Sequence, residues 1–153
     1  MPVKVGLAIF TDAEDEWVIA LTDSDYLTGS TRLYKIYARR NQVWCRKDWE
    51  VAGLLSAPRF RGVLHIGTLN VELPTLHGRM QSVCSSEGRG QPNPTDLPWG
   101  RKPWIVRVLL TFQSEYGLPI PRINQTEMPL YIETRIHMLI PSMPLLPMIP
   151  YAT

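Results

Sequence analysis

The chain has 153 residues, of which 44% are hydrophobic and 20% charged, and its net charge is +2. A chain of this length predicts one domain whose core is large enough to fold without disulfides, which excludes a small disulfide framework. Its 14 prolines exceed the usual share of about 5% and favour strands and loops over helices.

Period-two alternation of apolar and polar residues predicts strands along most of the chain. We expect them at 3–10, 17–22, 32–40, 63–73, 81–85, 104–116 and 131–140. The segment 17–22 also has helical spacing, with a possible capping box before it, but the strand is favoured. One short helix is expected at 49–56, where Asp48 can cap its first turn and Pro58 can end it.

These elements predict a mainly β fold, namely a single antiparallel β-sandwich or barrel domain with at most one or two short helices. The domain covers residues 1–140 and includes a long loop, rich in glycine and proline, at 85–103. Residues 141–153 are expected to form an extended, proline-rich C-terminal arm. Loops as long as 85–103 are usually functional or mobile.

The cysteines and apolar segments indicate the compartment. Cys45 and Cys84 do not form a C-x-x-C pair, which favours a reducing environment. The apolar run at 5–10 is too short for a signal peptide, and the apolar C-terminal stretch is too short and too interrupted by prolines to span a bilayer. We therefore expect an intracellular protein, cytoplasmic or in a virion, that is neither secreted nor membrane-spanning.

Charge is segregated along the chain. Residues 1–30 carry one lysine and six acidic residues, whereas residues 31–61 carry eight cationic and two acidic residues. Alternation places Leu33, Lys35, Tyr37 and Arg39 on one face of the expected strand. A face on which cations flank an aromatic ring suits single-stranded nucleic acid, because bases stack on the ring while cations contact phosphates. The candidate nucleic-acid-binding residues are Arg32, Lys35, Tyr37, Arg39, Arg40, Arg46 and Lys47.

The same basic segment has a plainer interpretation. Its cations can lie on a solvated strand face and pair with the acidic N-terminal segment of the same chain or of a neighbouring chain. No known RNA-binding signature occurs in the sequence.

The C-terminal arm has proline at every third position, which is the repeat of a polyproline II helix. It carries no charge, and its apolar side chains favour burial on its own sheet or on a neighbouring subunit. The candidate self-association residues are Pro141, Met143, Pro144, Leu146, Pro147, Ile149 and Pro150.

Catalytic and metal sites have little support. Cys84 borders the long loop and could act as a nucleophile with one of the three histidines, but no glycine pattern of the oxyanion type precedes it. The acidic stretch at 12–16 lacks the spacing of a calcium-binding loop, and the histidines and cysteines lack the paired spacing of zinc ligands. We therefore expect no catalytic residues, metal or cofactor.

Together these features favour a non-enzymatic, self-associating structural protein of the viral coat or matrix type. Its basic face would contact nucleic acid or an anionic membrane surface, it would form a homo-oligomer, and no small-molecule substrate is inferred. The alternative is a single-stranded RNA-binding β module, and the third hypothesis is a cysteine-dependent enzyme that uses Cys84.

Overall fold

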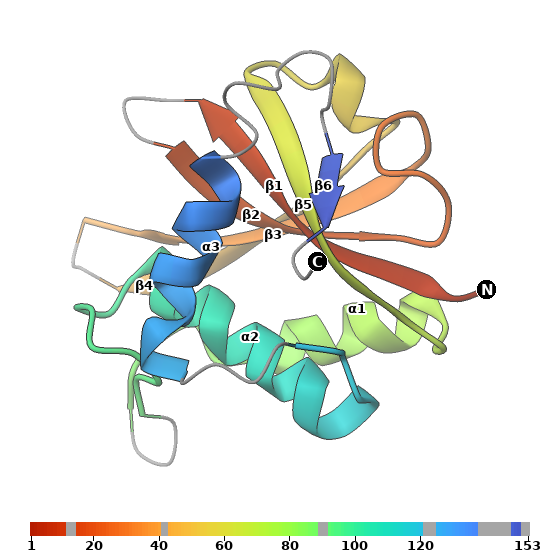
Figure 1. Cartoon of the computed structure of the whole chain (residues 1–153). Coiled ribbons are helices and arrows are strands. Elements are labelled where there is room, and N and C mark those ends of the chain that lie inside the picture. Colours follow the sequence, from red (N-terminus) through yellow and green to blue (C-terminus); the bar gives the residue numbers. More distant parts are fainter. Residues whose placement is uncertain (12–14, 41–42, 89–91, 121–124, 138–147, 151–153) are drawn as a thin grey trace.

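The computed structural model describes residues 1–11, 15–40, 43–88, 92–120, 125–137 and 148–150 (Figure 1). Five antiparallel strands form one sheet in the order β4-β3-β2-β1-β5, and a sixth, three-residue strand lies parallel to β5 at its outer edge. The strands are β1 (Val3–Thr11), β2 (Asp15–Thr22), β3 (Thr31–Ala38), β4 (Trp44–Val51), β5 (Phe60–Leu69) and β6 (Met148–Pro150).

The sheet has two different faces because successive residues of a strand point to opposite sides. On one face, Leu7 and Ile19 belong to a large buried core. On the other, Ala8 and Val18 belong to a smaller buried cluster. We call the first the helix-covered face and the second the open face.

Three helices pack on the helix-covered face, and all of them contribute side chains to its core. They are α1 (Leu73–Ser82), α2 (Arg101–Tyr116) and α3 (Met128–His137), and a 3-10 turn, η2 (Gln125–Glu127), precedes α3. Figure 1 shows α1 and α2 side by side beneath the sheet. This layer contains Trp104, which is completely buried.

The open face has a lighter cover. The loop after β2 and the 3-10 turn η1 (Leu54–Ser56) lie over one part of it, where Tyr26 and Leu54 are buried. The backbone N–H of Leu54 donates to the carbonyl of Tyr26 at 2.9 Å and holds these two segments together. The rest of this face contains a cleft, which is described below.

The expected strands at 3–10, 17–22 and 32–40 are confirmed by β1, β2 and β3, although β3 ends at Ala38. The expected strand at 63–73 is confirmed only up to Leu69. The five antiparallel strands also confirm the mainly β character of the fold. A sandwich or barrel is not confirmed, because the described strands belong to one open sheet, and the helices exceed the one or two short ones expected.

The strand expected at 104–116 is wrong, because this segment is the helix α2. Residues 103–109 of α2 are all buried, so this part of the helix has no amphipathic period, and its β-branched residues imitate a strand. Gly117, in the left-handed region at a φ of 73°, ends the helix by donating to the carbonyl of Gln113. The consecutive buried residues are Pro103, Trp104, Ile105, Val106, Arg107, Val108 and Leu109.

The strand expected at 131–140 is also wrong, because residues 128–137 form α3 and residues 138–140 lie outside the described part. Met128, Ile132 and Ile136 are buried and four residues apart. A spacing of four fits both a period of two and a period close to 3.6, so the apolar pattern alone did not separate strand from helix.

Two shorter expectations are corrected as well. The strand expected at 81–85 begins inside the last turn of α1, which buries Leu76 and Met80 on one side. The helix expected at 49–56 is the end of β4 followed by η1, because Trp49 and Val51 pair with residues of β3. Pairing with β3 along the whole of β4 outweighed the local capping signal of Asp48.

Most of the C-terminal arm lies outside the described residues, including Pro141, Met143, Pro144, Leu146 and Pro147. The described part, β6, contains Ile149 and Pro150, which pair with Leu64 and His65 of the same chain. This part of the arm therefore adds to the edge of its own sheet.

Candidate ligand-binding cleft on the open face of the sheet

A cleft of about 650 Å³ lies on the open face, a volume within the usual range for ligand sites of roughly 300 to 1,000 Å³. Strands β1 to β4 and the segment around η1 form its walls. Its lining residues are Phe10, Thr11, Glu16, Val18, Lys35, Lys47, Trp49, Val51, Ala52, Ser56, Ala57, Pro58 and Arg59. We call it the open-face cleft.

Trp49 is the central aromatic residue of this cleft. Its ring centroid lies 5.5 Å from Nζ of Lys35 and 5.4 Å from Nζ of Lys47. Both distances are within the range of a cation–π contact. The half-buried indole therefore has two ammonium groups within cation–π distance and lies at the edge of the small apolar cluster.

The register of β3 and β4 explains this arrangement. Lys35 lies opposite Lys47, and Leu33 lies opposite Trp49 in the same antiparallel pair. Residues two apart in a strand share a face, so both lysines and the tryptophan project to the open face. Two like charges directly opposite each other are destabilising, and the cation–π contacts with Trp49 offset part of this repulsion.

Glu16 of β2 is the acidic member of the cleft. Its Oε1 accepts a hydrogen bond from Nζ of Lys35 at 2.6 Å, and both side chains are largely buried. This ion pair joins the acidic N-terminal segment to the basic segment, as the plainer interpretation of the charge pattern expects. Lys47 is exposed and has no carboxylate partner among the described residues.

Arg59 lies at the rim of the cleft and has a φ of 64°, in the left-handed region that residues with a Cβ rarely adopt. Its carbonyl accepts a hydrogen bond from the N–H of Thr11 at 2.8 Å. This bond ties the turn before β5 to the end of β1 and fixes the backbone of the rim.

The structure divides the predicted basic residues between the two faces. Lys35 and Lys47 line the open-face cleft, whereas Arg32 and Arg46 serve the opposite face. Arg32 pairs with Asp48 at 3.1 Å, and Arg46 donates to the carbonyls of Met80 and Gln81 at the end of α1.

The remaining predicted residues lie outside the cleft. Tyr37 is half-buried near the end of β3, and Arg39 and Arg40 are exposed just after it. A hydrogen bond with Tyr37 raises the pKa of Arg39. These residues extend the positive charge of β3 beyond the cleft without lining it.

Sequence reasoning missed Trp49 and Glu16 as members of the site. Trp49 was missed because its segment was assigned to a helix, which removed it from the face of Lys35 and Lys47. Continuing the alternation of Lys47 and Trp49 would have placed them together on a strand.

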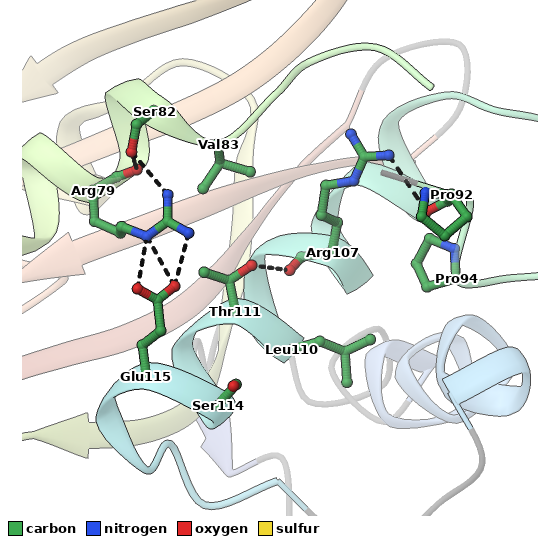
Figure 2. Close-up of a pocket in the computed structure, with 10 residues that line it drawn as sticks. All are labelled: Arg79, Ser82, Val83, Pro92, Pro94, Arg107, Leu110, Thr111, Ser114 and Glu115. Carbon is green, nitrogen blue, oxygen red and sulfur yellow. Dashed lines mark hydrogen bonds and ion pairs between the residues drawn. The ribbon is translucent and has the colours of Figure 1, made fainter. Parts of the chain in front are cut away.

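A second cleft, of about 420 Å³, lies between α1, α2 and the segments 83–88 and 92–100 (Figure 2). Its charged groups are already paired. Arg79 binds both carboxylate oxygens of Glu115, and Arg107 donates to the carbonyls of Cys84 and Ser86 at 2.9 and 2.8 Å. Arg107 also stacks over Trp99 at 4.1 Å, so it fastens the loop to α2.

Cys84 has some features of a reactive thiol. Its Sγ lies 3.4 Å from the hydroxyl oxygen of Ser86, and this contact, together with Arg107 nearby, lowers its pKa. His65 and His77 instead make hydrogen bonds with Tyr26 and Tyr34. A base for Cys84 is therefore not found among its described hydrogen-bond partners.

Within the described residues, no group of three His, Cys, Asp or Glu side chains is arranged to hold a metal ion. Asp25 uses its carboxylate to accept from the N–H groups of Leu27 and Thr28, and these bonds lower its pKa. No described helix is both long and apolar enough to cross a membrane.

No protein-family profile, curated protein or solved structure matches this chain. The function must therefore be argued from the chemistry of its own residues.

Proposed function

We propose that the open-face cleft binds single-stranded nucleic acid, the RNA-binding alternative drawn from the sequence. The observation that carries the proposal is the contact of the Trp49 ring with both Lys35 and Lys47 in a cleft on the open face. An exposed aromatic ring offers a stacking surface to any base, and adjacent cations pair with the phosphates that flank it.

The two lysines have different roles in this proposal. Lys35 is held by Glu16 and keeps the wall of the cleft in place. Lys47 is exposed, so its long side chain can leave the indole face when a base stacks there and pair with a phosphate. In this arrangement the Trp49 ring contacts the base and Lys47 contacts the phosphate.

The charge of the cleft supports modest affinity without strong sequence preference. Lys35 pairs with Glu16, so Lys47 is the lining cation for which no carboxylate partner is found among the described residues. Neutralising one phosphate of a single strand gives a slope of log K against log salt of about −0.7. A steeper slope would mean that Arg39 and Arg40 also contact the ligand.

Fluorescence anisotropy with a labelled oligouridylate tests the proposal. Trp49→Ala should weaken binding by about 1 to 3 kcal/mol, the usual contribution of one stacked base. Lys47→Gln should weaken binding and make the salt slope shallower. Binding that is unchanged in both variants would rule the cleft out.

Lys4→Gln is the matched control for the charge, because Lys4 lies on β1 and does not line the cleft. A heparin fragment is the control for the ligand, since it is anionic but has no bases. If heparin binds as tightly as the oligonucleotide and Trp49→Ala does not affect either, the surface recognises charge alone.

The self-associating structural subunit is the second candidate, and the position of β4 at the edge of the sheet favours it. Unpaired edges are places where chains associate. Deleting the chain from Pro141 should lower the mass in light scattering if the arm exchanges between subunits. An unchanged mass would exclude the arm as the assembly element.

A further inference from the structure

The outer edge of β4 has a defined set of backbone groups directed away from the sheet. The N–H of Arg39 donates to the carbonyl of Val43 at 2.9 Å, so these two residues form a hydrogen-bonded pair at the end of the ladder between β3 and β4. Hydrogen-bonded pairs recur at every second residue of an antiparallel ladder. Odd-numbered residues of β4 therefore direct their backbone groups to β3, and even-numbered residues direct theirs outward. The bond from Ser85 Oγ to the carbonyl of Trp44, at 2.8 Å, agrees with this parity.

Three residues remain along this edge after Trp44. The outward backbone groups of Arg46, Asp48 and Glu50 have no hydrogen-bond partner in the part of the chain that the structure describes. Each carries an N–H donor and a C=O acceptor in extended conformation, which is the pattern that an added antiparallel strand satisfies.

We propose that two copies of the chain pair along β4, antiparallel and with the two-fold axis at Asp48. In this register Arg46 lies opposite Glu50 of the second copy, and Glu50 lies opposite Arg46. Asp48 lies opposite its own equivalent. These three rungs use the outward groups of Arg46, Asp48 and Glu50 and leave Trp44, whose carbonyl is already bonded to Ser85, outside the ladder.

Side-chain charge supports this register. The two symmetric pairs of Arg46 with Glu50 bring opposite charges together on the helix-covered face. The two Asp48 carboxylates that meet at the axis each already have an arginine partner, since Arg32 contacts Asp48 at 3.1 Å in its own chain. The four charged residues of β4 sum to zero, so the edges do not repel each other.

Neighbouring registers are less favourable. An axis at Lys47 places two lysines opposite each other and requires the Trp44 rung that Ser85 occupies. An axis at Trp49 places Asp48 opposite Glu50, which sets like charges against each other on both sides of the axis.

Pairing of this kind would join the two open-face clefts. Lys47 would lie opposite Trp49 of the second copy, so each cleft would gain a cation and an aromatic ring from its neighbour. The two clefts then form one longer surface with two stacking rings. This consequence rests on the proposed nucleic-acid function, whereas the pairing itself does not.

Charge reversal tests the pairing without any ligand. Glu50→Arg and Arg46→Glu each place like charges opposite each other in a homodimer, and both variants should be monomers in sedimentation equilibrium. Mixed in equal amounts they restore both pairs, so the mixture should recover the dimer. Glu72→Arg, at an exposed position outside the sheet, is the control and should remain a dimer.

A disulfide test covers the case in which Arg46→Glu fails to fold, because Arg46 also contacts the end of α1. The proposed register places Cys45 opposite Val51 of the second copy, at a separation that suits a disulfide. Val51→Cys in a Cys84→Ser background should give a covalent dimer under mild oxidation, whereas Thr68→Cys should not.

A monomeric wild-type protein, or a dimer that Glu50→Arg leaves intact and Val51→Cys does not cross-link, would overturn the pairing. Because these measurements contain no nucleic acid, they separate its failure from that of the cleft. A monomer that still binds oligouridylate through Trp49 would keep the proposed function and exclude the dimer.

Discussion

The two faces of the sheet differ in how they are covered. Three helices bury the helix-covered face, and its core includes the fully buried Trp104 and Phe112. The open face has a smaller buried cluster beneath one loop and one 3-10 turn, and next to it lies a cleft that contains Trp49 and two lysines.

This difference indicates a division of roles. Burial of large apolar side chains is the main favourable term in folding, so the helix-covered face supplies most of the stability. The half-buried Trp49 and the exposed Lys47 contribute less to folding, which leaves them available for a ligand. Mutations on the two faces should therefore separate stability from binding.

The largest effect is expected at Trp104. Truncating a fully buried tryptophan removes its packing and leaves a cavity, so Trp104→Ala should lower the free energy of unfolding by about 3 to 5 kcal/mol. The indole N–H of Trp104 has no described hydrogen-bond partner, so Trp104→Phe should be much milder. Urea denaturation measures both, and equal losses would mean that the N–H is bonded.

A smaller loss is expected in the cluster of the open face. Leu54 is fully buried but belongs to the smaller cluster, so Leu54→Ala should cost about 2 kcal/mol, at the low end for such a change. The same urea denaturation measures it. A cost equal to that of Trp104→Ala would contradict the idea that the helix-covered face contributes more to stability than the open face.

Trp49→Ala should separate the two roles most clearly. The ring is only half-buried, so we expect a loss of stability near 1 kcal/mol together with a large loss of oligonucleotide binding. Denaturation and anisotropy on the same sample give both values. A variant that loses several kcal/mol while keeping its affinity would assign Trp49 to the core.

The pair of Tyr26 and His65 should make stability depend on pH. Tyr26 Oη lies 2.9 Å from Nδ1 of His65, and burial, with Lys4 nearby, lowers the pKa of His65 below its usual 6.5. A lowered folded-state pKa means that the unfolded chain binds the proton more readily. The contribution is thus complete above pH 6.5 and decreases as the pH falls toward the folded-state pKa.

Denaturation of wild type and His65→Gln at pH 7.5 and 5.5 isolates this contribution. The wild type should lose more stability between these two pH values than the variant does. An identical loss in both would assign the pH dependence to other groups, among them Asp25, whose lowered pKa acts at more acidic pH.

The smallest effect is expected at the ion pair of Arg79 and Glu115. Figure 2 shows this ion pair. Nη2 of Arg79 lies 2.7 Å from the carboxylate, but both side chains are partly exposed. Exposed pairs contribute about 0.2 to 1 kcal/mol, so Arg79→Gln should cost no more than this in urea denaturation. A larger loss of stability would mean that the ion pair contributes to folding as a buried pair does.

Some of the candidate site was predictable from local sequence. Alternation placed Lys35 on a strand face with Leu33, and the structure confirms this face. It did not identify Trp49 as the aromatic partner, because that partner comes from the next strand. Tyr37, the aromatic residue predicted to share this strand face, lies outside the cleft.

The errors have one physical cause. The strands β1, β2 and β3 are rich in β-branched and aromatic residues, and they were predicted correctly. Period-two alternation, which reports burial on one side, fails for α2, whose residues 103–109 are all buried, and for α3, whose spacing of four fits either structure. The cap at Gly117 and the length of α2 were the local signals that favoured a helix.

The sequence by itself determined the β-rich N-terminal half and the segregation of charge, and it predicts an extended shape for the proline-rich arm. These are local properties, set by alternation, composition and the fixed φ of proline. Tertiary structure alone decided that α2 lies beneath the sheet and that Lys35, Lys47 and Trp49 share one cleft. Both depend on contacts between residues distant in sequence, and no local pattern encodes such contacts.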